Sequence, residues 1–166
     1  MKETILFGNE GGFAIELGLT KTKKKFKLRF WMDGKRLGNF TKAGELKYSI
    51  KEYQKFIDNK NFYYLPIFDD LTSSQIFDYL VNFDFIYSTK KHDIEESEER
   101  TKFYLFFGDQ FANETGGFLL LYKNGKVVFI VKRPMDGPVD NYEIDVTIFC
   151  SVFDQYIEYC VVNKLV

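Results

Sequence analysis

The chain has 166 residues, of which 45% are hydrophobic and 28% charged, and its formal net charge is -1. This composition excludes a disordered chain, and no segment has the roughly 18 apolar residues that a membrane helix needs. A chain of this length is expected to form one domain, residues 1–166, with a core large enough to need no disulfide or metal.

The N-terminal part of the chain is expected to be built from strands. Residues 4–7 form a short apolar segment, and residues 8–12 contain the glycines of a turn. Residues 13–20 alternate loosely between apolar and other side chains, as a half-buried strand does. A lysine-rich connection over residues 21–25 then leads into the next strand.

Residues 26–40, FKLRFWMDGKRLGNF, predict a β-hairpin. Asp33 and Gly34 form a two-residue turn of the type I′ kind, in which both residues have positive φ. Apolar and basic residues alternate along the first strand, so one face is apolar and the other is basic. Trp31 and Arg36 on the basic face are placed for a cation–π contact, worth roughly 0.5–1 kcal/mol if exposed. The predicted register pairs Met32 with Lys35, Trp31 with Arg36, and Phe30 with Leu37.

Three segments have the 3.6-residue period of amphipathic helices. The first runs from about residue 45 to residue 59. The second begins at Thr72, which forms a capping-box pattern with Gln75. The third covers residues 146–162, with Asp145 as its N-cap. Its predicted buried stripe consists of Phe149, Val152, Phe153, Tyr156, Ile157 and Cys160.

Between the second and third helices the pattern returns to strands. Residues 102–107 predict a strand that is apolar on both faces, and residues 118–133 predict a second hairpin with Asn124-Gly125 as its turn. Because both faces of this hairpin are apolar, we expect central strands that are covered on both sides. The polar residues 90–101 and the proline-containing residues 133–142 are expected to be loops.

These elements predict an α+β fold, with a mostly antiparallel β-sheet built from hairpins and about three helices packed mainly on one face. Cys150 and Cys160 would lie about 15 Å apart along the third helix, given the rise of 1.5 Å per residue, and cannot form a disulfide with each other. Reduced thiols and the absence of a secretory signal at the N-terminus favour a cytoplasmic protein.

No group of residues in the sequence indicates catalysis, a cofactor or a metal site. The one histidine, His92, lies in the polar segment and is expected at the surface. The adjacent carboxylates Asp69 and Asp70 precede the second helix, where capping of the helix is favoured over acid–base catalysis. We therefore predict that the protein is not an enzyme. A large pocket lined by several convergent polar side chains would favour the opposite conclusion.

Charge is distributed unevenly along the chain. Residues 21–36 contain eight basic residues and one acid, whereas residues 136–163 contain six acids and no lysine or arginine. Such a two-sided distribution suits electrostatic steering toward a charged partner. A nucleic-acid-binding or assembly module that uses residues 21–36 is therefore an alternative function. Nucleic acid is disfavoured as the partner, because the apolar side chains alternate toward the core and the isoelectric point is near 5.9.

The first forty residues resemble a family of bacterial proteins. The matching segments are ILFGN at residues 5–9, FAIE at residues 13–16 and WMDGKRLGNF at residues 31–40. They are similar to the opening strands, the Trp-containing strand, the tight turn and the return strand of immunity protein family 42, one of the polymorphic-toxin immunity families. The shared residues belong to strands and a turn, so the resemblance implies no catalytic residue.

The resemblance implies a small cytoplasmic protein that binds a cognate toxin domain from a neighbouring bacterium and blocks it by stoichiometric occlusion. It implies neither a cofactor nor a membrane. A nuclease toxin is basic because it binds phosphates, and it would need an acidic surface on this protein. A toxin with an acidic surface would instead meet residues 21–36. The candidate partner-binding residues are Asp93, Glu95, Glu96, Glu98, Glu99, Asp136, Asp140 and Glu143.

Overall fold

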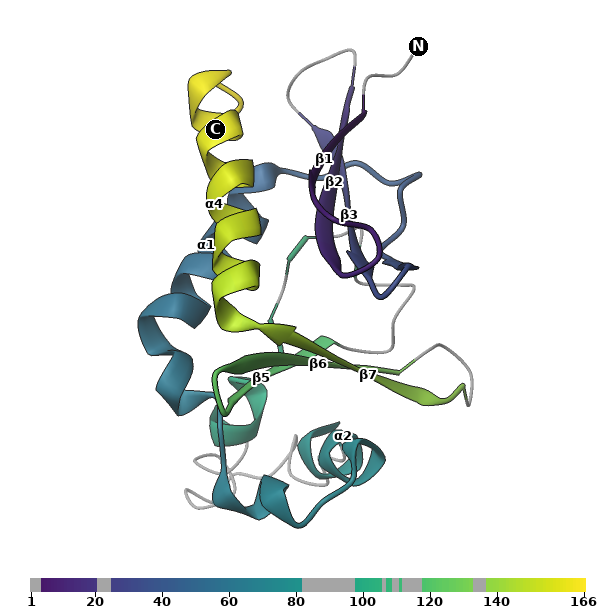
Figure 1. Cartoon of the computed structure of the whole chain (residues 1–166), viewed down its shortest axis with the longest axis vertical. Helices are drawn as coiled ribbons and strands as arrows, with labels where there is room; N and C mark the ends of the chain where they lie inside the picture. The colour runs from purple at the N-terminus through teal and green to yellow at the C-terminus, as the bar shows by residue number, and fades with distance from the viewer. Residues whose placement is uncertain are drawn as a thin grey trace.

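The strands form two antiparallel sheets, which Figure 1 shows one above the other. The computed structural model describes residues 4–20, 25–81, 98–105, 107–108, 111, 118–132 and 137–166. The N-terminal sheet has the order β1-β2-β3-β4, with strands β1 (Thr4–Gly8), β2 (Phe13–Leu19), β3 (Phe26–Met32) and β4 (Lys35–Leu37). The C-terminal sheet has the order β5-β6-β7, with strands β5 (Phe118–Lys123), β6 (Lys126–Lys132) and β7 (Val139–Asp145).

Both predicted hairpins are present with the predicted turns. In the turn between β3 and β4, Asp33 has φ 49° and Gly34 has φ 76°. In the turn between β5 and β6, Asn124 has φ 51° and Gly125 has φ 76°. Positive φ at both central positions matches the right-handed twist of the strands, so these dipeptides determine the pairing. The register of the first hairpin confirms the prediction, with Trp31 opposite Arg36, and in the second hairpin Leu120 lies opposite Phe129.

The helices occupy the predicted positions. They are α1 (Leu46–Asn59), α2 (Ser73–Val81) and α4 (Val146–Val162), and two short 3-10 helices, η1 (Lys60–Phe62) and η2 (Pro66–Asp69), lie between α1 and α2. Helix α2 begins with the predicted capping box, since Gln75 N donates to Thr72 Oγ1 at 3.3 Å and Thr72 N donates to Gln75 Oε1 at 2.9 Å.

Helix α4 connects the two sheets. It begins where β7 ends and runs along the N-terminal sheet, whose inner face it covers (Figure 1). Asp145 caps it as predicted, accepting a hydrogen bond of 2.8 Å from Thr147 N. The ring of Phe153 stacks on Tyr53 of α1, with centroids 4.4 Å apart, and meets Phe30 of β3 edge-on at 5.9 Å. The predicted stripe is buried at Phe149, Val152, Phe153, Tyr156 and Cys160, and Ile157 is partly buried.

The C-terminal sheet is covered on both sides, as its apolar composition predicts. Helix α4 packs on one side, and α2 lies beneath the other (Figure 1). Leu121 and Val128 on the α2 side line a hollow together with Ile76 of α2 and Phe68 of η2. The two cysteines are free thiols, as expected.

The α+β class is confirmed, but three details differ from the sequence-based expectation. The strands divide between two sheets instead of forming one. Residues 139–142, expected in a loop, belong to β7. Residues 102–105 form no regular strand, although the Phe103 carbonyl accepts a hydrogen bond of 3.1 Å from Leu120 N at the edge of β5. Most of the polar segment 90–101, including His92, lies outside the described residues, and its described end, residues 98–101, is helical where a loop was expected.

Candidate functional site

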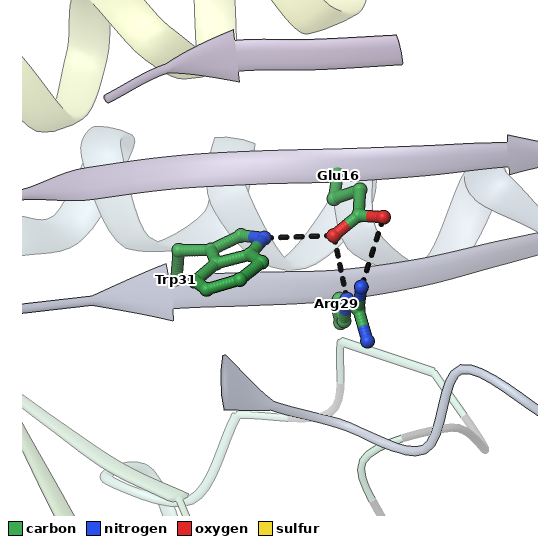
Figure 2. Close-up of polar contacts among 3 residues, drawn as sticks. All are labelled: Glu16, Arg29 and Trp31. Atoms are coloured by element: carbon green, nitrogen blue, oxygen red, sulfur yellow. Dashed lines mark hydrogen bonds and ion pairs between the residues drawn. The ribbon is translucent and has the colours of Figure 1, made fainter. Parts of the chain in front are cut away.

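The outer face of the N-terminal sheet carries a cluster of Glu16, Arg29 and Trp31, shown in Figure 2. The alternation of β2 turns Ile15 and Leu17 toward the core, so Glu16 between them faces outward. Antiparallel pairing of β2 with β3 places Glu16 directly opposite Arg29. Two strands that share a core face therefore also bring opposite charges together on the outer face.

The cluster is held by three hydrogen bonds to one carboxylate. Arg29 Nε donates to Glu16 Oε2 at 2.6 Å, and Arg29 Nη2 donates to Oε1 at 3.0 Å. Trp31 Nε1 donates to Oε2 at 2.7 Å. The side chains of Arg29 and Glu16 are only 16% and 12% exposed, so this bidentate pair is largely removed from water.

The hydrogen bonds determine the charge state of Glu16. Partial burial of the carboxyl group is the largest single effect and raises its pKa, but the hydrogen bonds from Arg29 and Trp31 and the positive charges of Arg29 and Arg36 together lower it by more. The net result is a pKa below the ordinary glutamate value. Glu16 is therefore ionised at neutral pH and compensates the charge of Arg29.

The predicted contact of Trp31 with Arg36 is confirmed, at 4.5 Å from the guanidinium carbon to the ring centroid. The sequence suggested that Trp31 is exposed on this face, but the residue is only 7% exposed. The reason is that Arg36 and Arg29, the latter 5.3 Å from the indole, cover the ring. The ring of Phe40 lies beneath both Arg29 and Lys27. Its centroid is 4.4 Å from Arg29 Cζ and 5.9 Å from Lys27 Nζ. We call Lys27, Arg29 and Arg36, with the two rings, the basic face.

Two of the candidate acids on β7 are engaged in ion pairs. Asp140 lies 3.7 Å from Lys35 of β4, which links the two sheets. Glu143 lies 2.8 Å from Lys126 of β6. Of the remaining candidates, Glu98 and Glu99 are exposed, whereas Asp93, Glu95, Glu96 and Asp136 lie outside the described residues. The assignment of these acids to a partner-binding surface stays a prediction.

The carboxylate of Asp69 does not cap α2, contrary to the expectation for the Asp69-Asp70 pair. It accepts a hydrogen bond from Tyr64 Oη and forms an ion pair with Lys123 of β5. The hydrogen bond from Lys123, followed by that from Tyr64, holds the pKa of Asp69 below its ordinary value. Asp69 thus ties η2 to the C-terminal sheet, and the hydrogen bonds at the start of α2 come from the capping box of Thr72 and Gln75.

A cleft lies between the turn end of the N-terminal sheet and the junction of β7 with α4. It encloses about 370 Å³, and we call it the turn cleft. From the sequence, Asp33 was expected to be a turn residue, and Asp145 was expected to be a helix cap and one of the six acids of residues 136–163. Ile148 carried no expectation of its own. All three line the turn cleft. No local sequence pattern reveals the cleft, because it forms only where the β1–β2 turn and the β3–β4 turn meet the end of β7.

Metal sites and membrane spans are both absent from the described part of the chain. No group of three or more His, Cys, Asp or Glu side chains there is arranged to hold a metal ion. None of the helices described is long and apolar enough to cross a membrane.

Comparison with protein families identifies the class of the protein as a bacterial immunity protein. The family model of immunity protein 42 (Imm42) matches residues 4–159, and the chain belongs to this family. The match extends from β1 almost to the end of α4, far beyond the N-terminal segments that carry the resemblance. Searches of curated proteins and of solved structures each found no match.

Proposed function

We propose that this protein neutralises a cognate bacterial toxin by binding it in a one-to-one complex that occludes the toxin's active site. The observation that carries the proposal is the family match over residues 4–159. The protein acts as a binding partner in the cytoplasm, without catalysis and without a cofactor. Its target is a toxin domain delivered by a competing bacterium.

The surface of the protein suits this role because its charged groups are held in place. Arg29 is fixed by two hydrogen bonds to Glu16, and Arg36 lies against the ring of Trp31. Charged groups that are ordered before binding lose little conformational freedom when a partner arrives. Complementary charge also speeds encounter, which an inhibitor that must intercept a toxin requires.

The first experiment is co-expression with the toxin domain encoded immediately upstream of this gene. We expect that the toxin domain alone arrests growth, that this protein restores it, and that the two co-purify in a one-to-one ratio. An immunity protein of another family, expressed at the same level, is the matched control and gives no rescue. Toxicity with neither rescue nor a complex would refute the pairing.

A nucleic-acid-binding or assembly module is the second candidate, because Lys27, Arg29 and Arg36 gather on one face. Phosphate binding by such a face weakens steeply as salt is raised. Changing Lys23, Lys24 and Lys25 together to Gln should then abolish binding to DNA or RNA. Binding that survives this change, or no binding by the unaltered protein, excludes this candidate.

A further inference from the structure

The turn cleft combines an apolar floor with open access to water. Phe13, Ile144 and Ile148 contribute apolar surface to it. Phe13 and Ile144 are buried, whereas Ile148 in the first turn of α4 is 52% exposed. The exposed half of Ile148, at the mouth of a concave surface, offers a place where a partner can bury apolar atoms.

The rim of the same cleft is acidic. Asp33, Glu143 and Asp145 line it, and its lining includes no lysine or arginine among the residues the structure describes. The carboxylate of Asp145 is fixed by Thr147 N at 2.8 Å, and the hydrogen bonds from Thr147 hold its pKa below the ordinary value. Lys35 and Lys126 are paired with Asp140 and Glu143, and the charge of Lys126 also acts on Asp145.

Asp33 is held at the rim by the backbone. Its N–H donates to Gly12 O at 2.8 Å, and Gly34 N donates to Glu10 O at 2.8 Å, so the β1–β2 turn and the β3–β4 turn are joined. Among the described residues, no hydrogen bond or ion pair engages the Asp33 carboxylate. The turn cleft therefore presents one carboxylate, carried on a fixed stretch of backbone, that the fold itself does not use.

We propose that the turn cleft is the docking site for the toxin and takes up a lysine or arginine side chain from it. This inference rests on the proposed function. The aliphatic stem of such a side chain packs on Phe13 and Ile148, and its charged head meets Asp33 and Asp145. The volume of about 370 Å³ lies near the lower end of the range of about 300–1,000 Å³ for ligand clefts, which suits one or two side chains.

The basic face is less suited to be the energetic centre of a complex. Its aromatic anchor, Trp31, is 7% exposed and lies under two guanidinium groups. Arg29 is compensated by Glu16. A partner would have to displace these contacts, whereas the turn cleft offers exposed apolar surface and an unengaged charge.

The test measures the dissociation constant of the complex with the upstream-encoded toxin domain, for the unaltered protein and two variants. Asp33→Asn removes the charge and keeps the turn, because Asn-Gly favours the same positive φ values. Ile148→Lys places a competing cation in the cleft. We expect at least a tenfold weakening for each variant. We also expect the salt dependence of binding to be smaller for Asp33→Asn than for the unaltered protein.

Two matched controls separate the cleft from general effects. Asp78→Asn removes the same charge from the exposed side of α2, and Val161→Lys adds the same cation at an exposed β-branched position of α4. Both should bind within twofold of the unaltered protein. Circular dichroism and the unfolding midpoint establish that all four variants are folded.

The outcomes distinguish this inference from the proposed function. If Asp33→Asn and Ile148→Lys are folded and bind as tightly as the unaltered protein, the turn cleft is not the docking site, and the immunity role stands. If Arg36→Gln weakens binding while the cleft variants do not, the basic face is the interface, and the inference is likewise overturned. If the unaltered protein does not bind the toxin domain, the proposed function fails and the inference fails with it.

Discussion

Trp31 Nε1 and Arg29 Nε donate to the same oxygen of Glu16, at 2.7 Å and 2.6 Å. One carboxylate on β2 therefore orients both an indole and a guanidinium on β3. The FAIE segment and the Trp-containing strand, which carry the family resemblance, meet at this point. In this chain the residues of the motif form a contact between two neighbouring strands.

Removing the charge of Glu16 should destabilise the fold. In Glu16→Gln the amide cannot accept both bonds from Arg29, which leaves a largely buried guanidinium without its counter-ion. We expect a loss of about 1–3 kcal/mol in the free energy of unfolding. Urea denaturation measures this change in the free energy of unfolding. Glu45→Gln is the matched control, because the exposed pair of Glu45 with Lys47 contributes little, and unfolding should be unchanged. Equal stability of the two variants would contradict the role of the cluster.

The same cluster gives stability a defined dependence on acid pH. The pKa of Glu16 is lower in the folded state than its ordinary value of 4.5, so the unfolded state binds the proton more tightly. The stabilisation is therefore fully present above about pH 4.5 and is lost as the pH falls through the folded-state pKa. The fluorescence of Trp31, the one tryptophan, follows unfolding directly.

Because the pKa of Asp145 is also lowered, the informative quantity is the difference between the unaltered protein and Glu16→Gln. We expect the two unfolding midpoints to converge between pH 7 and pH 3. A constant difference between the two midpoints over this range would show that the charge of Glu16 is not responsible for the stabilisation.

Gly8 should not tolerate a side chain. Its φ is +92°, and a Cβ there would lie 2.4 Å from the carbonyl oxygen of Phe13 and 2.8 Å from Val152 Cγ2. We expect Gly8→Ala to lose about 2 kcal/mol or more, from the left-handed backbone and the clash together. Gly11 lies in the same turn, with its nearest neighbour, Asn9 Oδ1, at 3.4 Å. Gly11→Ala should therefore stay within about 0.5 kcal/mol of the unaltered protein. Thermal unfolding compares the two, and similar losses would contradict this assignment.

The two cysteines should differ in reactivity. Burial raises the pKa of the Cys160 thiol to about 11, and its side chain is fully buried. Cys150 lines a shallow surface hollow beside Thr147 and Asp154. Iodoacetamide at pH 8 should therefore label the native protein at Cys150 alone, and label Cys160 only in urea. Peptide mass spectrometry identifies the site. The Cys150→Ser variant should take up no label while folded, and rapid labelling of that variant would indicate that α4 opens readily.

Elements with a local signal could be predicted from the sequence. Asp33-Gly34 and Asn124-Gly125 determine both hairpin registers, and the spacing of apolar residues defines α4 from Val146 to Val162. Strand β7 was missed because only Tyr142 and Ile144 of its seven residues are buried, which is too short an alternation to recognise. The buried residues Phe103 and Leu105 led to the opposite error, since an irregular segment can be as apolar as a strand.

The candidate site depends on contacts between distant parts of the chain. Glu16 and Arg29 are separated by 13 residues, and only the pairing of β2 with β3 makes them neighbours. Aligning the apolar faces of these two strands across the lysine-rich connection would have placed the opposite charges together, so a usable signal was present. The turn cleft had no such signal, because its acids and its isoleucine come from three separate elements.

The central position of α4 has a consequence for synthesis of the chain. Phe153 packs against Phe13 and Phe30 of the N-terminal sheet and against Tyr53 of α1, yet it is among the last of these residues to leave the ribosome. Until then the inner face of the N-terminal sheet lacks the helix that covers it. The N-terminal sheet and α1 therefore acquire their native packing only after α4 has been synthesised.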